Sequence, residues 1–105
     1  EAIRRVREEL PDPLLVIDLA YAEFATSDPG AALRDLPNTT VIRTLSKAWG
    51  LAGLRVGWTE SSPEIASSLR DSGGPYPVAS VSLDIASKTL LDPSTEATTV
   101  RHLRI

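Results

Sequence analysis

The sequence predicts an α/β fold built on a mostly parallel sheet with one antiparallel strand and with helices on both faces. The first observation is that short apolar, β-branched runs alternate with segments of helical periodicity; these runs are residues 14–18, 39–44 and 54–59. The second observation is the length of the connections. Twenty residues separate Asp18 from Thr39, which is enough for a helical crossover between parallel strands. Only nine separate Thr44 from Leu54, so the third strand is expected to return antiparallel to the second.

The first predicted elements are a helix and a strand. Apolar residues recur at near-helical spacing before the "PDP" of residues 11–13, which is expected to end the helix; they are Ala2, Ile3, Val6 and Leu10. The run "LLVID" of residues 14–18 is continuous and apolar, which is typical of a strand covered on both faces. Asp18 is therefore placed at the carboxyl end of the first strand.

A short helix is predicted to connect this strand to the next one, "TTVIRT" of residues 39–44. Ser27 or Asp28 can cap the helix, and Pro29 suits its first position because a proline lacks the backbone N–H that would be unpaired there. The helix is expected to end at about Leu36.

Another helix is expected after the third strand. Ser61 or Ser62, followed by Pro63 and Glu64, is typical of a capped helix start, and the helix is expected to continue to about Leu69.

The last predicted elements follow a loop at residues 71–78. One face of the next helix is expected to be apolar, because four residues fall at helical spacing; they are Ala79, Leu83, Ala86 and Leu90. Pro93 breaks the pattern, and a further helix is expected from Ser94 or Thr95. The chain contains no internal repeat or linker, so it is interpreted as one domain or part of one.

The composition excludes several classes of function. The 105 residues carry 14 acidic and 11 basic side chains with no basic block, so neither a nucleic-acid footprint nor a polybasic membrane patch is expected. No apolar run approaches the roughly 18 residues of a membrane span. The absence of cysteine excludes disulfides and cysteine-based metal sites and is consistent with a reducing, cytoplasmic location. The lone histidine, His102, is expected at the surface, and no metal site is expected.

The two ends of the sequence interrupt predicted helices. Glu1 begins within a helical pattern without an initiator methionine, and Ile105 ends a charged, helix-compatible stretch. The chain is therefore expected to be an internal piece of a longer polypeptide.

The stretch "RTLSKAWGLAGLRVGW", residues 43–58, carries the chemistry of the chain. Lys47 follows the second strand and is therefore expected at the same sheet edge as Asp18, where open α/β sheets bind ligands. Arginines outnumber lysines nine to two, so a merely solvated cation would more often have been arginine. A lysine beside hydroxyls, an arginine and an aspartate offers the groups that pyridoxal phosphate needs: an amine, donors for a phosphate and a carboxylate for the ring nitrogen. Alternatives at this point are a solvated loop lysine for Lys47 and a turn-forming role for Asp18.

A family resemblance supports the cofactor hypothesis. The motif "DLAYAEF" of residues 18–24, followed by residues 43–58, closely resembles the aspartate/aromatic superfamily of fold-type I pyridoxal-phosphate aminotransferases, and within it most of all the histidinol-phosphate aminotransferases. The resemblance covers nearly the whole chain, including "PYPV" of residues 75–78. It implies that residues 1–105 are the C-terminal portion of the cofactor-binding large domain, running toward the small domain.

The resemblance also implies a role for each matching residue. Lys47 would form the Schiff base with pyridoxal 5'-phosphate and then act as the general base and acid. Asp18 would pair with the pyridine nitrogen, and Tyr21 would donate to the phenolic oxygen of the ring. The phosphate would be held by Ser46 and Arg55, with Thr44 as a weaker candidate beside them.

The reaction implied by the resemblance is amino-group transfer between an amino donor and a 2-oxo acid, in this family histidinol phosphate and 2-oxoglutarate, by a homodimer. Alternatives are an aromatic aminotransferase, a threonine-phosphate decarboxylase or a truncated, non-catalytic fragment. One departure from the family pattern is Leu19, which stands where the family usually has an acid. The family's ring-stacking aromatic and carboxylate-binding arginine lie outside residues 1–105, so the chain alone is not expected to turn over.

Other prominent residues have structural interpretations. Trp49 and Trp58 are expected in a core or interface, Tyr76 is expected to pack between prolines, and Lys88 is expected to be solvated. Three glycines are expected to permit tight backbone geometry: Gly50, Gly53 and Gly57.

Overall fold

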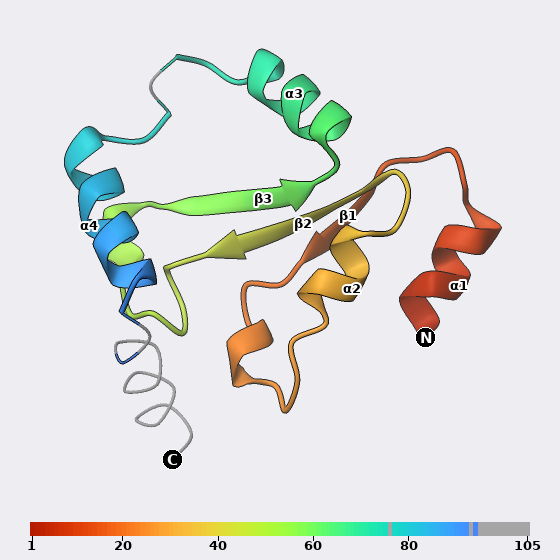
Figure 1. The fold of residues 1–105 in the computed structure, drawn as a ribbon, viewed down its shortest axis with the longest axis horizontal. Coiled ribbons are helices and arrows are strands. Elements are labelled where there is room, and N and C mark those ends of the chain that lie inside the picture. The colour runs from red at the N-terminus through yellow and green to blue at the C-terminus, as the bar shows by residue number, and fades with distance from the viewer. Residues whose placement is uncertain (76, 93, 95–105) are drawn as a thin grey trace.

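A three-stranded mixed sheet in the order β1-β2-β3 is the centre of the protein (Figure 1). The structure, a computed structural model, describes residues 1–75, 77–92 and 94. Along the chain the elements are α1 (Ala2–Glu9), β1 (Leu15–Asp18), the 3₁₀ turn η1 (Ala22–Phe24), α2 (Gly30–Arg34), β2 (Thr39–Thr44), the 3₁₀ turn η2 (Ala52–Leu54), β3 (Gly57–Ser61), α3 (Pro63–Ser72) and α4 (Ser80–Leu90).

The strand directions confirm the prediction from connection lengths. β1 and β2 are parallel, with Asp18 opposite Ile42, and β2 and β3 are antiparallel, with Thr44 opposite Gly57. The carboxyl ends of β1 and β2 therefore lie at the same edge of the sheet, and the chain leaves β2 there and returns into β3 (Figure 1).

Helices lie against both faces of the sheet, as predicted. Arg43 of β2 contacts Asp28 beside the start of α2, so α2 lies on the Arg43 face. On the opposite face Ala66 and Leu69 of α3 line a cavity together with Thr59. Ser62 caps α3 by accepting a hydrogen bond from the backbone N–H of Ile65 at 3.5 Å.

The third strand begins later than predicted. Leu54 belongs to η2 rather than to β3, and Arg55 adopts a left-handed conformation with a φ of 56° before the chain extends. Leu54 packs against a cluster of buried hydrophobic residues in the loop between β2 and β3 instead of pairing with β2. The predicted strand at residues 54–59 is therefore wrong at its start, although its direction is right.

Burial of the outer elements also differs from the predictions. β1 is an edge strand of the sheet, and Val16 is 53% exposed, so the expectation of a strand covered on both faces is wrong for the described residues. In α1 the buried residue is Arg7, whose guanidinium donates to the carbonyls of Pro11 and Pro13, while the apolar Val6 and Leu10 are exposed.

In α4 only Ala86 of the predicted apolar face is buried, flanked by the half-buried Ser82 and Thr89. The helix turns this narrow face toward the buried cluster of the loop, while Leu83 and Leu90 remain exposed. α2 is also shorter than predicted and ends at Arg34.

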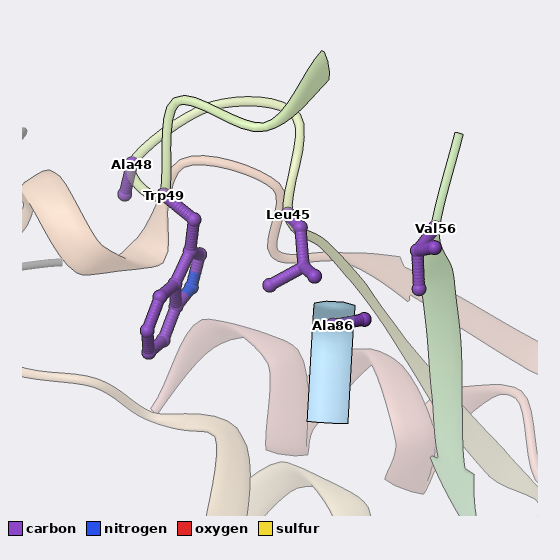
Figure 2. Close-up of a cluster of buried hydrophobic side chains, with 5 residues drawn as sticks. All are labelled: Leu45, Ala48, Trp49, Val56 and Ala86. Carbon is purple, nitrogen blue, oxygen red and sulfur yellow. The ribbon is translucent and has the colours of Figure 1, made fainter. Parts of the chain in front are cut away.

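A cluster of buried hydrophobic residues, the loop core, lies at the edge of the sheet, between α4 and the loop that joins β2 to β3. It consists of Leu45, Ala48, Trp49, Val56 and Ala86 (Figure 2). Leu45 and the Trp49 indole lie toward Ala86 of α4 in this view, so one helix and one loop enclose the cluster. The core position expected for Trp49 is confirmed, and Trp58 packs against the same cluster.

Some predictions fall outside the described residues: the packing of Tyr76, the surface position of His102 and the helix expected after Pro93. Within the described residues, no helix is long and apolar enough to cross a membrane. In the same part of the chain, no group of three or more histidine, cysteine or acidic residues is arranged to hold a metal ion.

Candidate active site

The loop between β2 and β3 holds its lysine outward by burying the residues on either side of it. Leu45 and Ala48 are fully buried and Trp49 nearly so, whereas Lys47 is exposed. Two backbone hydrogen bonds close the loop on itself, from Leu51 N–H to the Leu45 carbonyl at 2.9 Å and from Gly50 N–H to the Lys47 carbonyl at 3.0 Å. Such anchoring fixes the backbone at Lys47 while leaving its amine accessible.

Glycines in and beside this loop have different functions. Gly50 has a φ of 68°, a conformation that side chains other than glycine rarely adopt, so the prediction of a tight turn is confirmed there. At Gly57 an added Cβ would lie 2.7 Å from the Arg43 carbonyl oxygen, so the close strand pairing requires glycine. Gly53 has no such constraint, because an added Cβ there would meet no atom within 4 Å.

The hydroxyl of Thr44 joins the two ends of the loop. Its Oγ1 donates to the Val56 carbonyl at 3.3 Å and accepts from the backbone N–H of Ser46 at 3.1 Å. A hydroxyl has a single proton to donate, so a phosphate oxygen could take it only in exchange for the bond to Val56. Ser46 itself is half-buried beside Lys47.

Asp18 lies where β1 ends, and its side chain shapes the next turn. Its Oδ1 accepts a hydrogen bond from the backbone N–H of Ala20 at 2.9 Å, and the residue remains exposed. Leu19 continues the strand by one more bond, because its N–H donates to the Ile42 carbonyl at 3.0 Å. The turn-forming role considered for Asp18 is therefore present, and it uses one of the two carboxylate oxygens.

The structure brings two of the predicted site residues into contact. The Lys47 Nζ lies 5.4 Å from the centroid of the Tyr21 ring, within the range of a cation–π interaction. Tyr21 is 63% exposed, and its ring lies 6.1 Å from that of Phe24, which packs against the loop core. The amine and the phenol therefore face the same open space at the sheet edge.

Arg55 also lies at this edge, immediately before β3. It is exposed, its backbone is held in the left-handed region, and its Nη1 donates to the Ala52 carbonyl at 3.3 Å. Arg55 therefore lies outside the strand, although the predicted strand of residues 54–59 included it, because β3 begins at Gly57. A non-glycine residue in the left-handed region costs about 1 kcal/mol or more, and such conformations cluster at functional sites.

A second charged group beside the site was not predicted. Arg43 is buried and is surrounded by three carboxylates, at 2.8 Å from Asp28, 3.2 Å from Glu60 and 3.8 Å from Glu23. Burial lowers the pKa of Arg43, but the hydrogen bond and the charge of Asp28, followed by the charges of Glu60 and Glu23, outweigh burial and raise the pKa above its ordinary value. The available signal was an arginine inside the strand "TTVIRT", because a buried guanidinium requires paired acids.

One cavity among the described residues lies away from Lys47. Its volume is about 690 Å³, and it lies between β3 and α3, lined among others by Trp58, Ala66 and Leu69. At the Lys47 edge, by contrast, Asp18, Tyr21 and Lys47 are all exposed. Chemistry rather than cavity volume therefore identifies the candidate site.

The donor set at this edge fits pyridoxal phosphate. Lys47 offers a primary amine, Asp18 a carboxylate, Tyr21 a phenol and Arg55 an exposed guanidinium. These four side chains can bind, in the same order, an aldehyde, a basic ring nitrogen, a phenolic oxygen and a phosphate.

Comparison with known proteins places the chain in a family. The sequence profile of the family described as "Aminotransferase class I and II" matches residues 2–105. The chain belongs to this family.

Two relatives show which members of the family it is similar to. It is 43% identical over 95 residues to a histidinol-phosphate aminotransferase of Roseobacter denitrificans. The aligned region covers 88% of this chain and 26% of that protein. It is 40% identical over 93 residues to an aromatic amino acid aminotransferase of Streptomyces avermitilis, covering 84% of this chain and 26% of that protein. The chain thus spans about a quarter of the length of these relatives.

Solved structures agree with the fold. The crystal structure of histidinol-phosphate aminotransferase from Sinorhizobium meliloti in complex with pyridoxal-5'-phosphate superposes with a TM-score of 0.73 at 34% identity, over 83% of this chain and 24% of that one. L-threonine-O-3-phosphate decarboxylase from Porphyromonas gingivalis gives a TM-score of 0.77 at 24% identity, over 95% of this chain and 31% of that one. The predicted α/β fold of the fold-type I enzymes is therefore confirmed.

Proposed function

We propose that residues 1–105 form the C-terminal portion of the cofactor-binding large domain of a pyridoxal-phosphate-dependent aminotransferase, with Lys47 as the residue that binds the cofactor covalently. The observation that carries this proposal is the exposed Lys47 amine, held on a buried loop and lying over the Tyr21 ring. Membership of the aminotransferase class I and II family supports it.

The other residues at this edge each bind a different group of the cofactor. Asp18 binds the ring nitrogen and keeps it protonated by charge pairing, and Tyr21 donates to the phenolic oxygen. Arg55 and the Ser46 hydroxyl bind the phosphate, since a permanently charged, forked donor makes short paired bonds to its oxygens. Thr44 contributes indirectly, by tying the backbone of Ser46 to that of Val56.

Pyridoxal phosphate, when bound, supplies an aldehyde for covalent linkage and a protonated ring that withdraws electrons. The chain supplies the groups that position it and move protons. With the cofactor bound, the Lys47 amine would take the proton from the substrate α-carbon and return it. The loop core around Leu45 and Trp49 anchors the backbone that carries this amine.

For the substrate, we propose histidinol phosphate as the amino donor and 2-oxoglutarate as the acceptor, which places the protein in histidine biosynthesis in the cytoplasm. The 43% identity to the Roseobacter denitrificans enzyme supports this choice. An aromatic amino acid donor is the second candidate, because the Streptomyces avermitilis relative is nearly as similar. Initial rates with histidinol phosphate and with phenylalanine decide between them, and a higher kcat/KM for phenylalanine would contradict the first choice.

The proposal extends to the native polypeptide that contains residues 1–105. We propose that this polypeptide is a homodimer and that it supplies the substrate-facing residues from outside the chain. Light scattering of the purified polypeptide measures its mass; a monomer mass would contradict the dimer.

The cofactor assignment is tested with a matched pair of lysine variants. Lys47 and Lys88 are the two lysines of the sequence, and Lys88 is exposed on α4 in an ion pair with Asp84 at 2.7 Å. The native polypeptide is expected to develop a visible absorption band with pyridoxal phosphate, which Lys47→Ala abolishes and Lys88→Ala preserves. A band that survives Lys47→Ala, with the same borohydride-trapped adduct, would contradict the proposal.

A further inference from the structure

Arg43 connects three parts of the chain that meet beneath the candidate site. Its Nη2 lies 2.8 Å from Asp28, before α2, and its Nε lies 3.2 Å from Glu60 of β3. Its Nη1 lies 3.8 Å from Glu23, in the turn that follows β1. Arg43 itself is the residue before Thr44, where β2 passes into the lysine loop. The guanidinium therefore joins the Tyr21 segment to the strand that leads into the Lys47 loop.

Space around Arg43 is tightly defined. An added Cβ at Gly30 would collide with the Arg43 Nη2, and the Asp28 Oδ1 that accepts from Arg43 also accepts from the backbone N–H of Gly30 at 2.8 Å. Glu60 is fixed in turn by the Trp58 indole, which donates to its Oε1 at 3.2 Å. Because Asp28 holds Nη2 and Glu60 holds Nε, the guanidinium places Nη1 beside Glu23 in a fixed position.

The position of Tyr21 depends on its neighbours, because the residue itself is 63% exposed. Tyr21 is the N-cap of η1, and its side chain makes no hydrogen bond to that turn. Two residues later Glu23 is buried beside Arg43, and Phe24 packs against the loop core. The backbone of the turn is thus held at Glu23 and Phe24, and these two anchors set where the phenol lies relative to the Lys47 amine.

Glu23 depends on the charge of Arg43. Its side chain is 9% exposed, and its Oε2 is buried and has no hydrogen-bond partner among the described residues. At 3.8 Å the contact with Arg43 is a charge pair rather than a hydrogen bond. A buried carboxylate without a counter-charge is strongly unfavourable, so loss of this pair would drive Glu23 outward and carry the turn with it.

We propose that Arg43 is a positioning residue that acts through Glu23 to hold the Tyr21 phenol beside the Lys47 amine. The inference rests on the proposed function, because the phenol matters there as a ligand of the cofactor. Arg43 does not itself reach the cofactor; it determines where a ligand of the cofactor lies.

A double-mutant cycle in the native polypeptide tests this coupling. The variants are Glu23→Gln, Tyr21→Phe and the combination of both, and the readouts are the dissociation constant for pyridoxal phosphate and the visible absorption maximum. Each single variant is expected to weaken cofactor affinity by about fivefold to tenfold and to move the absorption maximum in the same direction. Because Glu23 acts through Tyr21, the double variant is expected to bind no more weakly than Tyr21→Phe alone.

Two arginine variants complete the test. Arg43→Lys replaces three separate guanidinium nitrogens by one ammonium group, which cannot lie beside Asp28, Glu60 and Glu23 at the same time. Glu23 is therefore expected to lose its adjacent counter-charge, and the variant to reproduce the effect of Glu23→Gln. Arg34→Lys is the matched control, since Arg34 is half exposed and pairs with the same Glu60 at 3.7 Å; it should leave both readouts unchanged.

The outcomes separate this inference from the proposed function. The positioning role would be overturned if the losses of cofactor affinity in the two single variants multiplied in the double variant. It would also be overturned if Arg34→Lys had the same effect as Arg43→Lys. In both cases Lys47 would still bind the cofactor. A wild-type polypeptide that binds no cofactor through Lys47 would overturn both.

Discussion

Replacement of Gly57 by alanine should destabilise the protein, even though alanine normally stabilises a chain relative to glycine. Gly57 lies opposite Thr44 in the antiparallel pair, and an added Cβ would lie 2.7 Å from the Arg43 carbonyl oxygen. Ordinary contact begins near 3.4 Å, and the obstructing atom belongs to the backbone of β2, which cannot rotate away. The two strands must therefore separate by several tenths of an ångström beside the lysine loop.

The size of the effect follows from two opposing contributions. Steric overpacking of this kind costs about 1–3 kcal/mol. The lower backbone entropy of alanine in the unfolded chain returns about 0.4–1 kcal/mol. We therefore expect Gly57→Ala to reduce the free energy of unfolding by about 1–2 kcal/mol.

Gly53→Ala is the matched control, because an added Cβ at Gly53 meets no atom within 4 Å. It should be neutral or stabilise the protein by up to about 1 kcal/mol. The assay is the urea midpoint of each apo polypeptide at an unchanged m-value. Equal shifts for the two glycines, or a stabilised Gly57→Ala, would refute the strand-spacing argument.

Three further predictions concern the same framework. Leu45→Ala should lower the free energy of unfolding by about 2–5 kcal/mol, because Leu45 is fully buried in the loop core; a urea midpoint near that of the wild type would contradict the core assignment. Gly30→Ala should destabilise despite its helical position, since its Cβ displaces the Arg43 guanidinium from Asp28; a raised melting temperature would show that Arg43 can move freely. Ser62→Ala should cost about 0.5–1 kcal/mol by removing the α3 cap. Hydrogen bonds from the backbone N–H of Glu64 and from the Ser62 side chain hold the pKa of the Glu64 carboxyl below its ordinary value of 4.5. The ionised carboxylate therefore stabilises the folded protein above pH 4.5, and this contribution is lost as the pH falls through the lower pKa of the folded state. Denaturant midpoints measured from pH 6 to pH 3 should therefore show a weaker acid dependence in Ser62→Ala, and an unchanged dependence would contradict this.

The topology of the sheet could be predicted because chain length constrains it. A connection of nine residues between Thr44 and Leu54 is too short for a parallel return, whatever the connection contains. The same constraint places Asp18 and Lys47 at one edge, and the structure confirms this arrangement through the parallel pairing of β1 with β2. The site could therefore be located from strand ends and residue chemistry.

Burial could not be predicted in the same way. Periodicity identified the apolar residues of α4, but burial depends on which element lies against the helix, and only the narrow face at Ala86 meets the loop core. The start of β3 was missed because Leu54 and Val56 are as suitable for core packing as for a strand.

The acid cluster around Arg43 was missed for a different reason. Glu23, Asp28 and Glu60 are each typical of a surface acid in sequence, and they lie 15 to 20 residues from Arg43 along the chain. The pairing of β2 with β3 and the return of α2 are needed to bring them to one guanidinium.

The most direct test of the central claim is the location of the cofactor in the chain. The holo polypeptide is reduced with borohydride and digested with trypsin, which cuts after Arg43 and Arg55 but not after a modified Lys47. We expect mass spectrometry to find the phosphopyridoxyl group on the uncut peptide of residues 44–55. Recovery of that group on the peptide that contains Lys88, or on no peptide of this chain, would contradict it.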